Sequence, residues 1–212
     1  MSPNPDRAQA ASVAKTRAGS GNAPPLWCDG WYALARRLES TNFNLRPDAV
    51  PIDMVVLHSI SLPPGQFGGG FIQDLFTNQL DWDAHPYFQS IRGAQVSSHF
   101  LIARDATLSQ FVSCDHRAWH AGLSSFQGRT NCNDFSIGVE LEGLEGQTFE
   151  PAQYTTLVQL CQALKLQYPL EFLVGHEHIA PGRKQDPGVG FDWAGLQLAL
   201  QWEPECYPFF SK

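Results

Sequence analysis

Two histidines and one aspartate stand where they could together bind a metal ion. His58 directly follows the apolar run 54–57, His176 follows a second apolar stretch, and Asp186 lies in the polar segment after it. Two imidazoles and one carboxylate make up the three protein ligands of a catalytic zinc ion and leave the fourth position for a water molecule. Because zinc lowers the pKa of such a water to about 7, these residue types predict a hydrolytic centre.

Each of these residues also has an ordinary explanation of its own. A lone histidine at the end of a strand is more often a structural or surface residue than a ligand. The segment 174–188 could be a solvated loop in which Lys184 and Asp186 only screen each other. Lys184 and Asp186 are two positions apart, however, so an extended chain would direct both side chains toward one site.

Glu140 is the candidate for the base that hydrolysis needs. Apolar and polar residues alternate over 136–143, so a strand there would turn Glu140 away from the apolar face. The same pattern makes Glu142 equally available, and an ordinary exposed acid is the alternative for both. Lys184 is the candidate for stabilising the oxyanion that forms when water attacks a carbonyl.

The elements that must position these residues are short strands joined by helices. The pattern predicts strands at 52–57, 97–103, 108–113, 136–143 and 171–175. The second and third of these should pair as a hairpin. Helices are predicted at 71–80, 151–168 and 191–202. Strands followed by helices indicate an α/β domain built on one sheet.

The composition indicates one globular domain behind a polar tail. At 212 residues and 43% hydrophobic content, the chain is long enough to bury a substantial single core. Residues 1–25 are rich in small and polar residues, which is typical of a disordered tail. No later linker or repeat divides the chain, so we expect one catalytic domain at 26–212.

Charge, hydropathy and cysteine content argue against several classes of protein. The formal net charge of -7 without a polybasic block argues against nucleic-acid binding. The chain lacks both the apolar run of a signal peptide and the roughly eighteen consecutive apolar residues of a membrane span. Its five cysteines form no C-x-x-C pair, so free thiols are expected. We therefore expect a cytoplasmic protein with no membrane, nucleic-acid or obligatory protein partner.

Several longer motifs carry a resemblance to a known family. They are VVLH at 55–58, SLPPGQFGG at 61–69, RAWHAG at 117–122, CNDFSIGVELEG at 132–143 and the histidine-rich segment 175–188. In these motifs and in their order, the chain resembles the cytoplasmic anhydro-muramoyl-L-alanine amidases that recycle cell-wall fragments. These enzymes belong to the type-2 amidase and peptidoglycan-recognition group, and the resemblance spans about residues 27–193.

The resemblance implies a role for each candidate. His58, His176 and Asp186 match the ligands of one zinc ion, Glu140 matches the catalytic acid/base, and Lys184 matches the group that supports the transition state. The implied fold is a mixed central β-sheet flanked by helices. The implied reaction cleaves the amide between the lactyl group of (1,6-anhydro-)N-acetylmuramic acid and L-alanine of the stem peptide.

The residues expected to bind the substrate match the family pattern less completely than the metal-binding and catalytic residues do. Trp119 and His120 fall in a family motif near the implied cleft, where an aromatic wall could stack on a sugar ring. A packed tryptophan and a structural histidine are the alternatives. Three positions depart from the family pattern, because Ser59 replaces an Asn and both Gln95 and Asn131 replace Arg. In the family those arginines help bind the carboxylates of the stem peptide. Arg92 and Arg129 lie nearby in the sequence, and we expect Arg129 to take over this role.

Two other functions are open at this stage. The first is a non-catalytic peptidoglycan-binding module on the same fold, although here the implied ligand set is intact. The second is a Cys-His hydrolase that uses Cys114 or Cys132, although neither has the sequence context of an activated thiolate. The remaining histidines are expected to be structural, namely His85, His99, His116 and His178.

Overall fold

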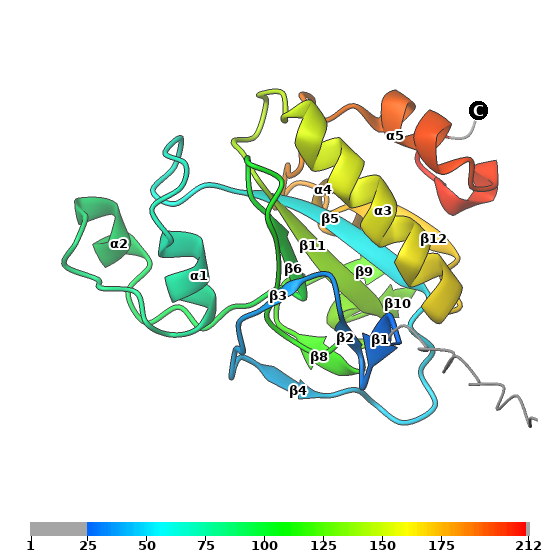
Figure 1. Cartoon of the computed structure of the whole chain (residues 1–212), viewed down its shortest axis with the longest axis horizontal. Helices are drawn as coiled ribbons and strands as arrows, with labels where there is room; N and C mark the ends of the chain where they lie inside the picture. The colour runs from blue at the N-terminus through cyan, green and yellow to red at the C-terminus, as the bar shows by residue number, and fades with distance from the viewer. Residues whose placement is uncertain (1–24, 211–212) are drawn as a thin grey trace, which may run out of the picture.

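A six-stranded mixed β-sheet forms the centre of the computed structural model, which describes residues 25–210 (Figure 1). Its strands lie in the order β12 (Phe172–Gly175), β5 (Met54–Ile60), β11 (Ser136–Glu142), β6 (Phe100–Ile102), β7 (Leu108–Gln110) and β3 (Arg36–Arg37). The first four strands are parallel, and β7 returns antiparallel to β6. The mixed sheet and the hairpin are confirmed. The expected tail at 1–25 lies outside the described residues except for Pro25.

Short strand pairs and helices complete the described part of the chain. The pairs are β1 (Trp27–Cys28) with β2 (Trp31–Tyr32), β4 (Phe43–Leu45) with β8 (His116–Ala118), and β9 (Ser125–Phe126) with β10 (Arg129–Thr130). The helices are α1 (Phe71–Phe76), α2 (Pro86–Ser90), α3 (Pro151–Gln167), α4 (His176–Ile179) and α5 (Trp193–Leu200), with single turns η1 (Cys132–Asp134) and η2 (Pro204–Cys206). Helix α1 ends before the predicted residue 80, since Asn78 adopts a φ of 59° that an α-helix does not accommodate.

Strand β11 is buried on both faces, which differs from the half-exposed strand that its alternating pattern predicted. It pairs with β5 on one side and β6 on the other, and all seven of its residues are buried. Its apolar residues belong to the same core cluster as the buried residues of α3, which lies across this face of the sheet (Figure 1). Glu140 and Glu142 are only 8% and 5% exposed, so neither is an ordinary surface acid.

The two acids of β11 differ in their surroundings. Glu142 accepts a hydrogen bond from the Gly68 amide at 2.6 Å through Oε1 and one from the Arg104 amide at 3.1 Å through Oε2. Both of its carboxylate oxygens are therefore committed to backbone amides, one of them in the glycine-rich segment 61–70. Glu140 has no such partners, so the structure separates two residues that the sequence left equivalent.

Helix α3 is fixed to the end of the sheet where the acids lie. The Glu150 amide donates to Oε1 of Gln153 at 3.0 Å at the start of the helix. The buried Gln153 amide then donates to the carbonyls of Ile102 and Glu142, at 3.0 and 3.1 Å. One side chain thus joins the carboxyl ends of β6 and β11 to the helix that covers them.

All five cysteines are free, and four of them are buried. Between residues 25 and 210, no helix combines the length and the apolar character needed to cross a bilayer.

Arg46 links the small β4–β8 sheet to the start of β11. Its guanidinium donates to the carbonyls of Cys114, Asn133, Asp134 and Ser136 at 2.8–3.1 Å. Burial lowers the pKa of Arg46 to about 10, so the group stays charged at neutral pH. Charged donors to carbonyls are stronger than neutral ones, and Arg46 therefore holds the η1 segment in place.

Replacing Arg46 should destabilise the fold. Because Arg46→Ala leaves several carbonyls without donors, the free energy of unfolding should fall by about 2–4 kcal/mol, as measured by chemical denaturation. Arg92→Ala is the matched control, since Arg92 pairs with Asp83 in an exposed ion pair that contributes about 1 kcal/mol at most. Equal stability of the two variants would contradict the role assigned to Arg46.

Candidate metal centre and active site

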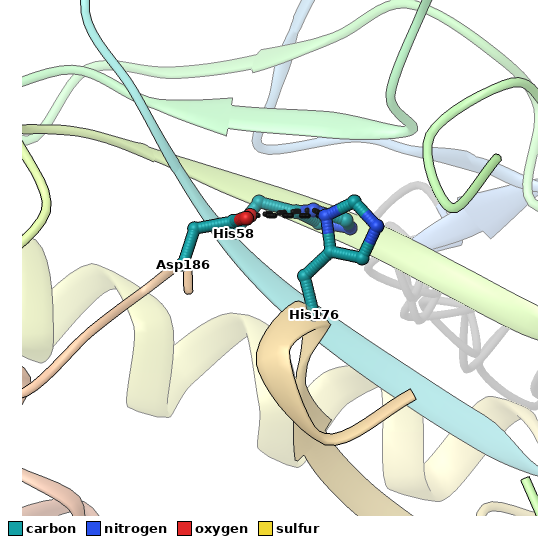
Figure 2. A group of neighbouring side chains, drawn as sticks. All are labelled: His58, His176 and Asp186. Atoms are coloured by element: carbon teal, nitrogen blue, oxygen red, sulfur yellow. Dashed lines mark hydrogen bonds and ion pairs between the residues drawn. The ribbon is translucent and has the colours of Figure 1, made fainter. Parts of the chain in front are cut away.

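His58, His176 and Asp186 meet at one end of the sheet with their ligand atoms together (Figure 2). Nδ1 of His58 lies 3.0 Å from Nδ1 of His176, and each nitrogen lies 3.1 Å from Oδ2 of Asp186. The three residues are 1%, 3% and 4% exposed. Tetrahedral bonds of about 2.0–2.1 Å imply ligand atoms about 3.3 Å apart, so this cluster has nearly the spacing that zinc requires.

Strand pairing brings the two histidines together from distant parts of the chain. His58 lies within β5 rather than after it, because β5 continues to Ile60 in register with β11. Gly175, the last residue of β12, pairs with Leu57, so His176 emerges beside His58 as the first residue of α4. The segment 174–188 therefore begins with a strand end and a helical turn rather than being a loop throughout.

Close packing around Gly175 shapes the turn that carries His176. A Cβ atom on Gly175 would lie 2.8 Å from Cδ of Pro187, so a larger residue would push away the segment that carries Asp186. The Gly175 amide donates to Nδ1 of His178 at 2.8 Å, and the His178 ring stacks on Phe209. His178 is therefore a structural residue of this turn.

The protonation of the two histidines supports a metal between them. Nε2 of His176 lies 3.1 Å from the carbonyl oxygen of Ala121 and 3.4 Å from the Arg183 guanidinium. The carbonyl is the shorter contact and can only accept, which favours a proton on this nitrogen. With the proton on Nε2, Nδ1 of His176 directs a lone pair at the carboxylate of Asp186. Burial lowers the pKa of His58 to about 4, so the His58 ring is neutral at pH 7. Lone pairs that face one another in a buried site favour a bound cation.

Two buried oxygens without hydrogen-bond partners also favour a bound cation. Among the described residues, Oδ1 of Asp186 and Oε2 of Glu140 are buried side-chain atoms without a hydrogen-bond partner. Burial on its own raises the pKa of Asp186, but the contacts with His176 and His58 hold that pKa below its ordinary value. The carboxylate is therefore ionised, and the donor set of two imidazoles and one carboxylate fits zinc.

Glu140 lies beside His58 on the neighbouring strand, because the two residues are register partners on β11 and β5. Burial, and then the negative charge of Asp186, raises the pKa of Glu140 well above its ordinary value, whereas Lys184 lowers it. A carboxyl group with a raised pKa can both take up and release a proton near neutral pH. Glu140 thus has the electrostatic environment of a general acid/base.

A cavity of about 220 Å³ contains all five residues that the sequence predicted for metal binding and catalysis. The predicted Trp119 and His120 line it as well, and Nε1 of Trp119 donates to Oδ1 of Asn44 at 2.6 Å. Sequence reasoning did not single out the other lining residues, Ile60, Phe76, Val96, Ser97 and Glu145. Apart from the consecutive Val96 and Ser97, they come from separate parts of the chain and share no motif, so only the fold could identify them.

The structure does not bring Arg129 to this cavity. Its guanidinium binds the Asp53 carboxylate at 2.6 and 3.3 Å and lies 3.9 Å above the ring of Phe135. Asp53 precedes β5, whereas His58 lies near the other end of that strand. Arg92 is likewise paired elsewhere, with Asp83. Of the three departures from the family pattern, only Ser59 lines the cavity.

The cysteines do not form a second catalytic centre. Burial raises the pKa of both Cys114 and Cys132, which disfavours the nucleophilic thiolate. Neither residue lines the cavity that holds the histidines and acids. The hypothesis of a Cys-His hydrolase therefore finds no support in the described part of the chain.

Comparisons with known proteins point to one group of enzymes. Residues 48–189 match the family described as N-acetylmuramoyl-L-alanine amidase. The chain is 51% identical over 174 residues to the 1,6-anhydro-N-acetylmuramyl-L-alanine amidase AmpD of Citrobacter freundii, covering 81% of this chain and 93% of that protein. AmpD of Escherichia coli (strain K12) is 48% identical over 176 residues, which are 82% and 96% of the two chains.

Solved structures agree with these matches. The crystal structure of a Se-Met AmpD derivative has a TM-score of 0.80 at 49% identity and covers 83% of this chain and 99% of its own. A complex of the amidase AmiD from E. coli with the substrate anhydro-N-acetylmuramic acid-L-Ala-D-gamma-Glu-L-Lys has a TM-score of 0.52 at 31% identity. That match covers 74% of this chain and 60% of AmiD.

Removing the charge of Lys184 should raise the pKa of Glu140 further. Lys184 opposes burial and Asp186, so Lys184→Met leaves only the influences that favour the neutral acid. Carbon-13 NMR titration of the Glu140 carboxyl group in metal-free protein measures this shift. Arg92→Met, which removes a positive charge that is paired with Asp83 instead, should leave the titration unchanged. A lower pKa in Lys184→Met would refute the electrostatic argument.

Proposed function

The chain belongs to the N-acetylmuramoyl-L-alanine amidase family, and from this premise we propose that it is a zinc-dependent amidase that acts on anhydro-muropeptides. The bond cleaved is the amide between the lactyl group of 1,6-anhydro-N-acetylmuramic acid and L-alanine of the stem peptide, during recycling of cell-wall fragments. One observation carries the proposal. The buried cluster of His58, His176 and Asp186 shares a single cavity with Glu140 and Lys184.

The substrate assignment is supported by relatives that cover nearly the same length of chain. Their names specify the 1,6-anhydro-N-acetylmuramyl-L-alanine amide, and their identity of about half extends over most of both chains. The similar AmiD structure contains an anhydro-muramyl tripeptide. The indole of Trp119, fixed by its hydrogen bond to Asn44, offers a wall of this cavity on which a sugar ring could stack.

The mechanism follows from the chemistry of these residues. Zinc held by His58, His176 and Asp186 would lower the pKa of a water molecule and polarise the scissile carbonyl. Oε2 of Glu140 takes the proton of the attacking water and returns it to the departing amine nitrogen, which its raised pKa favours. The ammonium group of Lys184 stabilises the negative charge that develops on the carbonyl oxygen.

The alternative is a module that binds peptidoglycan without cleaving it. Loss of a ligand or of the base would favour that alternative, but both are present around one cavity in this chain. The absence of Arg129 from the cavity bears on peptide recognition and leaves the hydrolytic residues unaffected. A cytoplasmic location stays a prediction.

Metal removal tests the proposed cofactor. The purified protein should contain about one zinc per chain, and a chelator should abolish release of free peptide from anhydro-muropeptide until zinc is restored. Asp186→Asn should weaken zinc binding, because it replaces an anionic ligand with a neutral one. Full activity in metal-free protein would contradict a zinc mechanism, whereas zinc and substrate binding without turnover would favour the binding module.

Replacing Glu140 tests the proposed acid/base. Glu140→Gln should keep its zinc and lower kcat by about 10²–10⁴-fold, since amide and acid have similar shapes but only the acid transfers a proton. Steady-state kinetics and metal analysis on one preparation measure both quantities. Glu171→Gln is the matched control, because Glu171 is exposed and does not line the cavity. Wild-type turnover in Glu140→Gln would exclude Glu140 from the chemistry.

A further inference from the structure

Two consecutive residues lie behind the two metal-binding histidines. Nε2 of His58, on the side of the ring opposite the ligand atom, lies 2.9 Å from Nδ1 of His120. Nε2 of His176 lies 3.1 Å from the carbonyl oxygen of the next residue, Ala121. The segment 119–121 therefore contacts the far nitrogen of both rings, although His58 and His176 are more than a hundred positions apart in the chain.

A buried asparagine holds this segment in place. Oδ1 of Asn133 accepts hydrogen bonds from the amides of His120 and Ala121, at 3.1 and 2.8 Å. Asn133 is 5% exposed, belongs to η1 and does not line the cavity. Two bonds from consecutive amides to one oxygen set the direction of both residues. The position of Asn133 is itself set by Arg46, which donates to the Asn133 carbonyl.

Strand β11 leaves room for the His120 ring at Gly138, which has no side chain. A Cβ atom on Gly138 of β11 would lie 2.5 Å from Cγ of His120, so only glycine allows the ring to reach His58. The backbone of Trp119 is also fixed, since its amide donates to Oγ of Ser97 at 3.0 Å and its carbonyl accepts from the Ser97 amide. These contacts indicate a position built for His120 rather than an incidental approach of two rings.

The hydrogen bonds behind His120 determine where its proton lies. Oγ of Ser136 donates to the carbonyl of Cys132 at 2.6 Å, so the hydroxyl oxygen is free to accept from Nε2 of His120 at 3.3 Å. Nδ1 of His120 is then the acceptor for the proton on Nε2 of His58. The lone pair of His58 is thereby left on Nδ1, the atom that faces His176 and Asp186.

We propose that Asn133 and the segment 119–121 act as a positioning device that sets the tautomer and ring orientation of both metal-binding histidines. His120 is in this view a positioning residue for His58, in place of the substrate-binding role expected from the motif. The inference rests on the proposed metal site. Groups that fix the second nitrogen of a ligating histidine typically change metal affinity by about 10–100-fold.

Asn133→Ala tests the device without replacing any residue that lines the cavity. Zinc affinity, measured by competition with a chromophoric chelator, should fall by about 10–100-fold, because neither His120 nor Ala121 keeps its anchor. Asn133→Asp retains the accepting oxygen and should restore most of the affinity. Gln162→Ala is the control at an exposed position of α3, and its affinity should equal that of the wild type.

His120→Phe provides a second test that leaves the anchor intact. The phenyl ring keeps the shape of the imidazole but offers no acceptor, so zinc affinity should fall while the thermal unfolding of metal-free protein changes little. Nitrogen-15 NMR of the imidazoles should show the Nε2-protonated tautomer of His58 in the wild type and a mixture of tautomers in His120→Phe. A purely structural role for His120 would leave the tautomer unchanged.

The outcomes separate this inference from the proposed function. A wild-type protein without zinc affinity would refute the metal site and the positioning device together. Tight zinc binding by the wild type, with equal affinity in folded Asn133→Ala and His120→Phe, would refute the positioning device alone. Weaker binding in both variants, with recovery in Asn133→Asp, is the expected result.

Discussion

The parallel pairing of β5 with β12 and β11 is the constraint on which the site depends. Its register sets Glu140 opposite His58 and brings His176 to the end of the neighbouring strand. Backbone hydrogen bonds hold adjacent strands about 4.7–4.9 Å apart, within the reach of imidazole and carboxylate side chains. The sheet itself thus sets the spacing of three functional groups, and the segment after α4 only has to return Asp186 to the same place.

This arrangement places charge where the fold otherwise excludes water. Asp186 and Glu140 each keep a buried oxygen that has no hydrogen-bond partner among residues 25–210. Burying unpaired polar atoms is unfavourable, and the apolar clusters on the two faces of the sheet must offset the cost. A cation between the ligand atoms would reduce it. Proteins retain such locally unfavourable groups mainly at functional sites, which agrees with the proposed role of the cluster.

Partners, rather than residue type, separate the functional residues from structural ones. Glu140 and Glu142 are both buried on β11, but Glu142 has both oxygens bound to backbone amides. Likewise, His178 accepts from the Gly175 amide, whereas His58 and His176 direct Nδ1 at Asp186. The ligand atoms of the two histidines and Oε2 of Glu140 are thus free of backbone partners. The Arg129 guanidinium is likewise committed to the Asp53 carboxylate and does not line the cavity.

The sequence by itself determined the fold class, the main helix α3 and the hairpin, and it singled out five residues that the structure brings to one cavity. These features depend on local periodicity and on long motifs. It could not separate Glu140 from Glu142, place Arg129, or show that β11 is buried on both faces. Those features depend on which distant segments cover a strand and which amides reach a carboxylate. The link from Asn133 to the two histidines is of the same kind, since it joins four segments that only the folded chain brings into contact.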